Sequence, residues 1–221
     1  MQNRSKQDFN GLRKPDHDAV SKTVSTDLGR LYIRGPVNPE ELSGYQLSEG
    51  LCCFRPPKNQ HEALVELAGQ PDGIVFIAAL ASEVITYATF QKPDFPWWIR
   101  RCFPRLIELG CIETDLSWRN MGLSKVLLDS ALKNPDFNFF EDFIIIAVHT
   151  VYSWDLKNSC LTPWDYRRFM LRMFKKYNFV PWETEDPEIR EHPCNILLAR
   201  VGANIEPDQI RHFSNCCLGV N

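Results

Sequence analysis

The chain has 221 residues, of which 44% are apolar and 24% are charged, a composition typical of a globular protein with a buried core. The net charge is −3, so no positive field covers the whole molecule, and nucleic acid is not expected as a main partner. The longest apolar run, 74–81, is far shorter than the ~18 residues of a membrane-spanning helix. The first residues are polar and do not resemble a secretory signal. We therefore expect a cytoplasmic protein with no membrane partner.

Residues 1–28 are polar, with scattered Val and Leu, and carry too little apolar surface to fold against. We expect a flexible tail there, followed by a single domain over 29–221. In the first half of this domain, strand and helix patterns alternate. They predict a strand at 30–34, a helical turn at 39–42, a helix at 58–69, a strand hairpin at 73–81 and 83–91, and a strand at 106–114.

The second half opens with an amphipathic helix at 122–133 and an apolar strand at 143–148. A strand, a helix and a strand in this order are typical of a parallel βαβ unit. A helix at 162–177 has an apolar stripe on one side and Arg and Lys on the other. Two strands at 179–183 and 195–201 and a helix that begins at Pro207 complete the chain. The pattern predicts an α/β or α+β fold with a mixed sheet, and it excludes all-α and all-β folds.

The eight cysteines do not have the spacing of a metal site or of a disulfide framework. They form two adjacent pairs and four single residues, and no CxxC motif occurs. We therefore expect free thiols and no bound metal.

The turn between the strand 106–114 and the helix 122–133 is the candidate for chemistry. N–H groups at a helix start lack intrahelical acceptors and lie at the positive end of the helix dipole, so they can hold a phosphate group. Gly122 at the helix start would let a ligand approach the backbone. Taken alone, the same residues also fit an ordinary connection between a strand and a helix.

The spacing R-x-x-G-x-[small], at Arg119, Gly122 and Ser124, resembles the acetyl-CoA pyrophosphate motif of the GNAT N-acetyltransferases. Ser124 departs from the usual last residue of this motif, which is Gly or Ala. Across 29–202 the chain more specifically resembles the acetoin-utilisation acetyltransferase (AcuA) family. The matching blocks are RGPV at 34–37, FRPP at 54–57, QHEALV at 60–65, LIELG at 106–110, WDLK at 154–157 and DPEI at 186–189. The resemblance implies the GNAT acyl-CoA N-acyltransferase fold and a protein lysine acetyltransferase that inactivates acetyl-CoA synthetase.

The same resemblance implies a binding site for the cosubstrate acetyl-CoA and no metal. Main-chain groups of Ile112 and Thr114, with Glu113 between them, would lie along the pantetheine, and an N–H near Ile112 would polarise the thioester carbonyl. The pyrophosphate would lie on the turn that follows. The residues of this turn are Arg119, Asn120, Met121, Gly122, Leu123 and Ser124.

Acetyl transfer to lysine needs a base, because the amine is protonated at neutral pH. Glu108 lies eleven residues before Arg119, where several histone-type members of the superfamily carry their base. Its apolar neighbours in the strand would raise its pKa. An edge or surface glutamate without a role is the alternative interpretation. Glu113 is the competing carboxylate, which strand alternation sends to the opposite face.

Tyr152 is the candidate acid that would return a proton to the CoA thiolate, whereas Tyr166 lies on the apolar stripe of the helix 162–177 and fits the core better. Single histidines at 61, 149 and 192 are expected to form structural hydrogen bonds.

Two basic segments stay open to more than one interpretation. Residues 97–101 with Arg105 fit either a protein-docking site or a tryptophan pair in the core. The Arg and Lys face of the helix 162–177 fits a solvated surface, an acidic partner or the phosphates of CoA. Acetylation of a small amine, or binding of acyl-CoA or the synthetase without turnover, are the alternative functions.

Overall fold

The structure is a computed structural model that describes residues 20–95, 97 and 105–220. The chain groups into two compact units, residues 1–92 with 111–137 and residues 93–110 with 138–221. Strand β6 (Leu106–Thr114) begins in the second unit and ends in the first. None of the helices in the described part of the chain is long and apolar enough to span a membrane.

The first unit contains a mostly antiparallel sheet in the order β1-β2-β4-β5-β6. Its strands are β1 (Val20–Thr26), β2 (Gly29–Gly35), β4 (Ile74–Leu80), β5 (Glu83–Gln91) and the end of β6, and the short β3 (Gln46–Leu47) pairs in parallel with β5. β4 and β5 consist largely of buried apolar residues, which explains their central place in the sheet. The tight turn between them lies at Ala81, whose φ is 52°.

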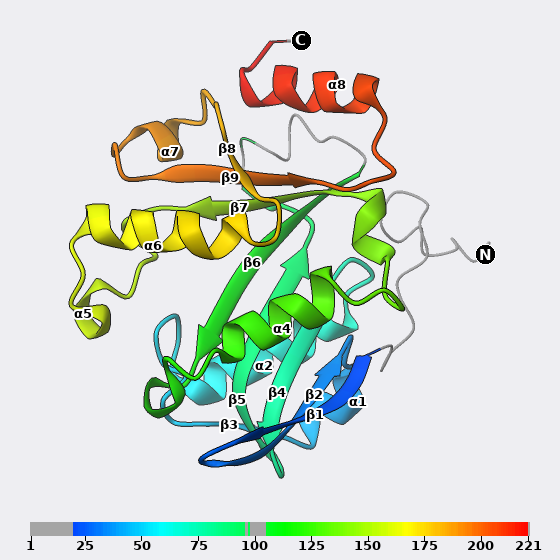
Figure 1. The fold of residues 1–221 in the computed structure, drawn as a ribbon, viewed down its shortest axis with the longest axis vertical. Coiled ribbons are helices and arrows are strands. Elements are labelled where there is room, and N and C mark those ends of the chain that lie inside the picture. The colour runs from blue at the N-terminus through cyan, green and yellow to red at the C-terminus, as the bar shows by residue number, and fades with distance from the viewer. Residues whose placement is uncertain (1–19, 96, 98–104, 221) are drawn as a thin grey trace, which may run out of the picture. The chain divides into compact units, whose positions relative to one another are not determined.

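Helices cover both faces of this sheet, with α4 (Leu123–Leu132) in front of β4 and β5 and α2 (Pro57–Gly69) behind them (Figure 1). A short helix, α1 (Pro39–Ser43), lies beside α2. Leu64 of α2 belongs to the same core as Val75 and Ile77 of β4. The helices therefore form where the sequence supplies an apolar face to a strand that needs covering.

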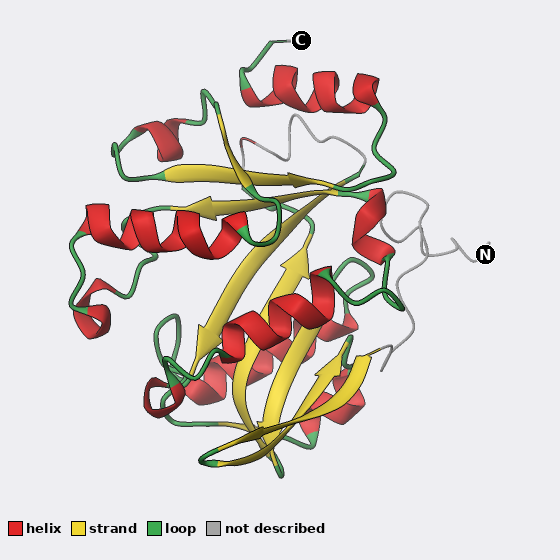
Figure 2. Cartoon of the chain, viewed as in Figure 1, coloured by secondary structure: helices red, strands yellow, loops and turns green. Residues whose placement is uncertain are grey.

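The second unit contains the start of β6, followed in the sheet by β7 (Ile144–His149), β9 (Ile196–Val201) and β8 (Val180–Trp182). β6 and β7 are parallel, as the strand–helix–strand pattern predicted, and the other pairs are antiparallel. Helices α6 (Pro163–Lys175) and α8 (Pro207–Cys217) lie on opposite sides of the β7–β9 pair (Figure 2). Two shorter helices, α5 (Leu156–Ser159) and α7 (Pro187–Arg190), and the turn η3 (Phe139–Asp142) complete the unit.

Side-chain alternation along β7 explains how two helices cover this pair of strands. Ile144 and Ile146 belong to the same core as Phe213 of α8. His149 points to the other face, where its ring contacts Phe174 of α6 at a centroid distance of 5.1 Å.

The predicted tail is wrong for its last residues, because Val20–Thr26 forms β1 and pairs with β2 from Val20↔Gly35 to Thr26↔Gly29. This strand has only one buried residue, Val20, so its stability comes mainly from backbone pairing, which an apolar-content argument does not detect. Residues 1–19 lie outside the described part. The single domain over 29–221 stays a prediction.

Candidate functional site

The turn expected to hold phosphate connects β6 to α4 in the first unit, through the short helix η2 (Leu116–Trp118). Asn120 and Gly122 have left-handed backbone conformations, with φ of 66° and 76°. A Cβ at Gly122 would meet no atom within 4 Å, so the space beside it is open. The backbone conformation favours glycine here, and the open space lets a ligand come close to the main chain.

The N-terminus of α4 differs from that of α6. Gly122 is the N-cap of α4, and among the described residues no side chain caps this helix and its first turn has no acidic residue. In α6 the side chain of Thr162 accepts a hydrogen bond from the N–H of Asp165, at 3.2 Å. The first N–H groups of α4 and the positive end of its dipole are therefore available to an anion.

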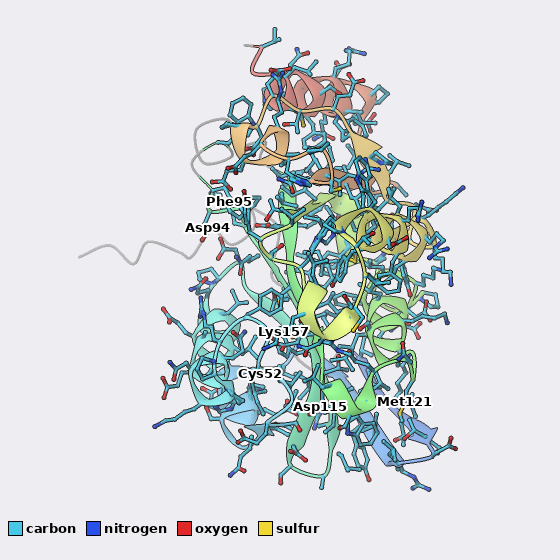
Figure 3. The ribbon with its side chains drawn as sticks, turned by 90° about the vertical axis from the view of Figure 1, so that its left-hand side faces the viewer. Cys52, Asp94, Phe95, Asp115, Met121 and Lys157 are labelled. Atoms are coloured by element: carbon cyan, nitrogen blue, oxygen red, sulfur yellow. The ribbon has the colours of Figure 1, made fainter. Side chains whose placement is uncertain are left out.

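Asp115 holds the start of this turn in place through hydrogen bonds. Figure 3 labels Asp115 and Met121, which lies further along the turn. Its carboxylate accepts hydrogen bonds from Ser48 Oγ at 2.7 Å and from the N–H groups of Gly50 and Ser117 at 3.1 and 2.7 Å. Burial acts to raise the pKa of Asp115, but these hydrogen bonds outweigh it and lower the pKa. Our sequence reasoning missed this residue, although Asp115-Leu116-Ser117 has the local signature of an Asp that caps its own turn.

Arg119 lies beside the turn in contact with two other segments. Its Nη2 donates to Cys53 Sγ at 3.2 Å, and its Nε lies 3.5 Å from the carbonyl oxygen of Thr114. The guanidinium of the motif arginine is therefore positioned by Cys53 and by the end of β6.

Glu113 has a fully engaged carboxylate in the first unit. Its side chain is 4% exposed, and it accepts hydrogen bonds from the Tyr87 hydroxyl at 2.5 Å and from the N–H of Cys53 at 2.8 Å. Burial, together with the neighbouring Cys111 and Glu113, raises the pKa of Tyr87. Through these hydrogen bonds the carboxylate connects β5 and the segment at Cys53 to the end of β6.

Glu108 lies on the part of β6 that belongs to the second unit, opposite Ile146 of β7. Its side chain is only 5% exposed, and among the described residues it has no hydrogen-bond partner. Burial, assisted by the negative charge of Asp94, raises the pKa of Glu108 to about 8. Apolar neighbours had predicted a raised pKa, whereas nothing in the sequence predicted the approach of Asp94, which is labelled in Figure 3.

The two candidate tyrosines have different surroundings in the second unit. Tyr152 lies in the loop after β7 and is 74% exposed, so its hydroxyl is accessible. Tyr166 stacks on Trp154, with ring centroids 5.0 Å apart, but it is only half-buried, so the expected place in the core is wrong.

Two of the three single histidines form the structural hydrogen bonds predicted for them. His61 Nε2 lies 2.9 Å from the carbonyl oxygen of Leu42, and His192 Nδ1 accepts from the N–H of Cys194 at 3.0 Å. The prediction is wrong for His149 Nε2, which has no hydrogen-bond partner in the structure that is described. Its environment is apolar, and burial lowers the pKa of His149 to about 4, so its ring is neutral and packs on Phe174.

The two basic segments show mainly structural contacts. Trp97 packs against the core beneath α8, and Arg105 forms an ion pair with Asp142 at 3.6 Å, while residues 98–101 lie outside the described part. On α6, Arg168 pairs with Asp165, and the lysines near the helix end are exposed. None of the seven described cysteines forms a disulfide bond. No cluster of three or more potential metal ligands occurs among the residues that the structure describes.

No protein-family model matches the chain, but named relatives are similar over most of its length. The acetoin utilization proteins AcuA of Bacillus subtilis (strain 168) and Bacillus licheniformis are each 37% identical over 194 residues, which cover 87% of this chain and 91% of each relative. A crystal structure of an acetoin utilization protein from Exiguobacterium sibiricum 255-15 shows 38% identity and a TM-score of 0.83. This match covers 90% of this chain and 94% of that one.

The fold agrees with these similarities. A strand, a glycine turn and a helix are followed by a strand parallel to the first, within a mixed sheet, as the resemblance to the GNAT fold predicted. This chain belongs to the family of the acetoin utilization protein AcuA, which its sequence resemblance places among the GNAT-type acetyltransferases.

Proposed function

We propose that this chain transfers the acetyl group of acetyl-CoA to a protein lysine by direct attack in a ternary complex, and that its substrate is acetyl-CoA synthetase. The observation that carries the proposal is the state of Glu108. This carboxylate is buried, has no hydrogen-bond partner among the described residues and has a pKa of about 8. A buried carboxyl group that no described residue stabilises as an anion, and whose pKa is raised, favours a role in proton transfer.

A pKa of about 8 suits a general base that works near neutral pH. The substrate amine arrives as an ammonium ion and must lose a proton before it can attack. Glu108 would take this proton, directly or through a water molecule. The exposed hydroxyl of Tyr152 would return a proton to the leaving thiolate of CoA.

The β6–α4 turn fits the pyrophosphate of acetyl-CoA, the cosubstrate that supplies the activated acetyl group. Open space beside Gly122, an α4 start without a side-chain cap, and the Arg119 guanidinium supply the features that a phosphate group needs. We assign the pyrophosphate to the turn Arg119, Asn120, Met121, Gly122, Leu123 and Ser124.

The end of β6 would hold the pantetheine through main-chain groups of Ile112 and Thr114. An N–H near Ile112 would polarise the thioester carbonyl. Glu113 would support this strand through its bonds to Tyr87 and Cys53 rather than contact the cosubstrate with its carboxylate.

Acetyl-CoA synthetase is proposed as the partner because the sequence resembles a family to which this substrate is assigned, and both proteins would act in the cytoplasm. Acetylation of an active-site lysine would switch the synthetase off. The lysine that carries the acetyl group would therefore identify both the reaction and its consequence.

The test is intact-mass analysis of purified acetyl-CoA synthetase after incubation with this protein and acetyl-CoA. We expect a gain of one acetyl group that maps to a single lysine, and no gain without enzyme or with Glu108→Gln. No gain with the wild-type enzyme, together with a stable complex in size-exclusion chromatography, would replace the proposal by a binding module. Neither gain nor complex, with acetylation of a small amine instead, would overturn the protein substrate.

A further inference from the structure

Ser124 is the residue at which the turn departs from the usual motif, and its hydroxyl belongs to a chain of three hydroxyl groups in the first unit. Ser124 Oγ lies 2.9 Å from Thr114 Oγ1, and Thr114 Oγ1 lies 2.7 Å from Thr86 Oγ1. Thr86 Oγ1 in turn lies 2.5 Å from the carbonyl oxygen of Glu113. These three hydroxyl groups therefore connect the first turn of α4 to β6 and β5.

Counting protons fixes the direction of every bond in this chain. A carbonyl oxygen can only accept, so Thr86 donates its single hydroxyl proton to Glu113. Thr114 must then donate to Thr86, and Ser124 must donate to Thr114. The Ser124 hydroxyl proton is consequently used inside the protein.

This direction decides what Ser124 can do for a bound pyrophosphate. Ionised phosphate oxygens accept hydrogen bonds and donate none, so a hydroxyl whose proton is already used cannot bond to them. We propose that Ser124 is a positioning residue, whose hydroxyl connects the start of α4 to Thr114 and Thr86, and that this hydroxyl does not bond to the pyrophosphate, which the main chain of the turn would hold. This inference rests on the proposed binding of acetyl-CoA at the β6–α4 turn.

The hydrogen bond from Ser124 to Thr114 matters for ligand binding because of how α4 begins. The start of α4 lacks a side-chain cap, and Gly122 before it has a left-handed backbone conformation and no side chain to hold it in place. A hydrogen bond from Ser124 to β6 would keep the first N–H groups of α4 in place before the ligand arrives. Preorganisation of this kind increases affinity without adding a contact to the ligand.

Thr86→Val gives the sharpest test, because Thr86 is completely buried and cannot touch a ligand. We expect Thr86→Val, Thr114→Val and Ser124→Ala each to weaken CoA binding about 2- to 10-fold, the range for one lost hydrogen bond. Isothermal titration calorimetry with CoA measures this without any acceptor protein. The double variant Ser124→Ala/Thr114→Val should bind CoA no more weakly than whichever single variant has the lower affinity, because both changes remove the same hydrogen bond.

Ser130→Ala is the matched control, since Ser130 is a buried serine of the same helix that bonds to Val126 within α4. It should leave CoA affinity unchanged, and melting temperatures of all variants show whether folding is affected. In steady-state kinetics Thr86→Val should raise KM for acetyl-CoA and leave kcat unchanged, because Thr86 is buried and touches neither the cosubstrate nor the reacting atoms.

The opposite pattern would overturn the inference. If Ser124 were a phosphate ligand, Ser124→Ala would weaken binding, whereas Thr114→Val and Thr86→Val would leave affinity equal or higher by freeing the serine proton. If the wild-type protein bound no CoA, the proposed function would fail together with the inference. If it bound CoA but acetylated no protein, only the proposed substrate would fail.

Discussion

Strand β6 carries two buried glutamates, and they differ in almost everything except exposure. Glu108 and Glu113 are 5% and 4% exposed. Glu113 accepts hydrogen bonds from a tyrosine hydroxyl and a main-chain N–H, whereas Glu108 accepts none among the described residues. Burial raises the pKa of Glu108 to about 8, with Asp94 as a second cause.

The comparison teaches that burial alone does not make a base. A carboxylate that receives hydrogen bonds is stabilised as an anion and fixed in place, and it then acts as a structural connection. A carboxylate left without donors keeps its affinity for a proton. The side of the strand on which each residue points therefore separates a structural role from a chemical one.

The largest effect that this comparison predicts is a loss of kcat in the variant Glu108→Gln. Loss of the base should lower kcat about 10²- to 10⁴-fold, because general-base catalysis contributes that much. CoA affinity, measured by calorimetry, should be unchanged. An unchanged kcat would remove Glu108 from the mechanism and erase the difference between the two glutamates.

The pH dependence of the reaction should report the pKa of Glu108. Since the ionised form is the active base, its population rises with pH, reaches one half at about pH 8 and levels only above that pH. Between pH 6 and pH 8 this population grows about 50-fold. The ratio of wild-type to Glu108→Gln rates removes the titration of the substrate amine and should show this rise. A ratio that is flat over this range would contradict the assignment.

Glu113→Ala should act on stability instead of chemistry. It leaves the Tyr87 hydroxyl and the Cys53 N–H without their acceptor, at a cost of about 1–3 kcal/mol for each buried donor. Denaturant unfolding should therefore show a clear loss of unfolding free energy, while the folded enzyme keeps its kcat. Glu113→Gln, which retains an acceptor oxygen, is the conservative control and should lose less. A fall in kcat as large as that of Glu108→Gln would show that the roles are reversed.

The same pKa predicts how Glu108 affects stability. A carboxyl with an ordinary pKa of 4.5 that rises to about 8 on folding binds more protons in the folded state across that range. The contribution of Glu108 to the free energy of unfolding is therefore fully present below pH 4.5, and it is lost as the pH rises toward 8. Relative to wild type, Glu108→Gln should gain unfolding free energy across this window, as denaturant titrations at several pH values would reveal.

The smallest effect is expected for Asp94→Asn. Removing the negative charge near Glu108 should lower the pKa of Glu108 modestly, because burial is the larger cause. The acid limb of the pH–rate profile should move to lower pH, but by less than the difference between the pKa of about 8 and the ordinary value of 4.5. The value of kcat at high pH should not change. A profile identical to wild type would show that burial alone determines the pKa.

Local patterns predicted most of the fold. The strand 106–114 has the predicted bounds, and the helices at α2, α4 and α6 lie where apolar periodicity placed them. The short elements β3, α5 and α7 were not predicted. The longest element that was missed, β1, has one buried residue and is held by pairing with β2, so its own sequence carries little signal.

The candidate site was predicted only where its signal is local. The raised pKa of Glu108 followed from its apolar neighbours in the strand, and the open approach to the backbone at Gly122 from the motif. The anchors of the turn did not follow, because Ser48 and Asp115 are 67 positions apart, and Cys53 and Glu113 are 60 apart. Contacts between such distant positions depend on the tertiary fold, and no spacing in one sequence encodes them.

The uncapped start of α4 has a consequence for local stability. Without a side-chain acceptor, the amide hydrogens of its first turn depend on solvent or a ligand for a partner, whereas α6 has Thr162 for this purpose. In the free protein these amides should exchange with deuterium quickly, through local opening that leaves the rest of the unit folded. Addition of CoA should slow exchange at α4 and leave α6 unaffected, so that the ligand completes the helix that the chain leaves open.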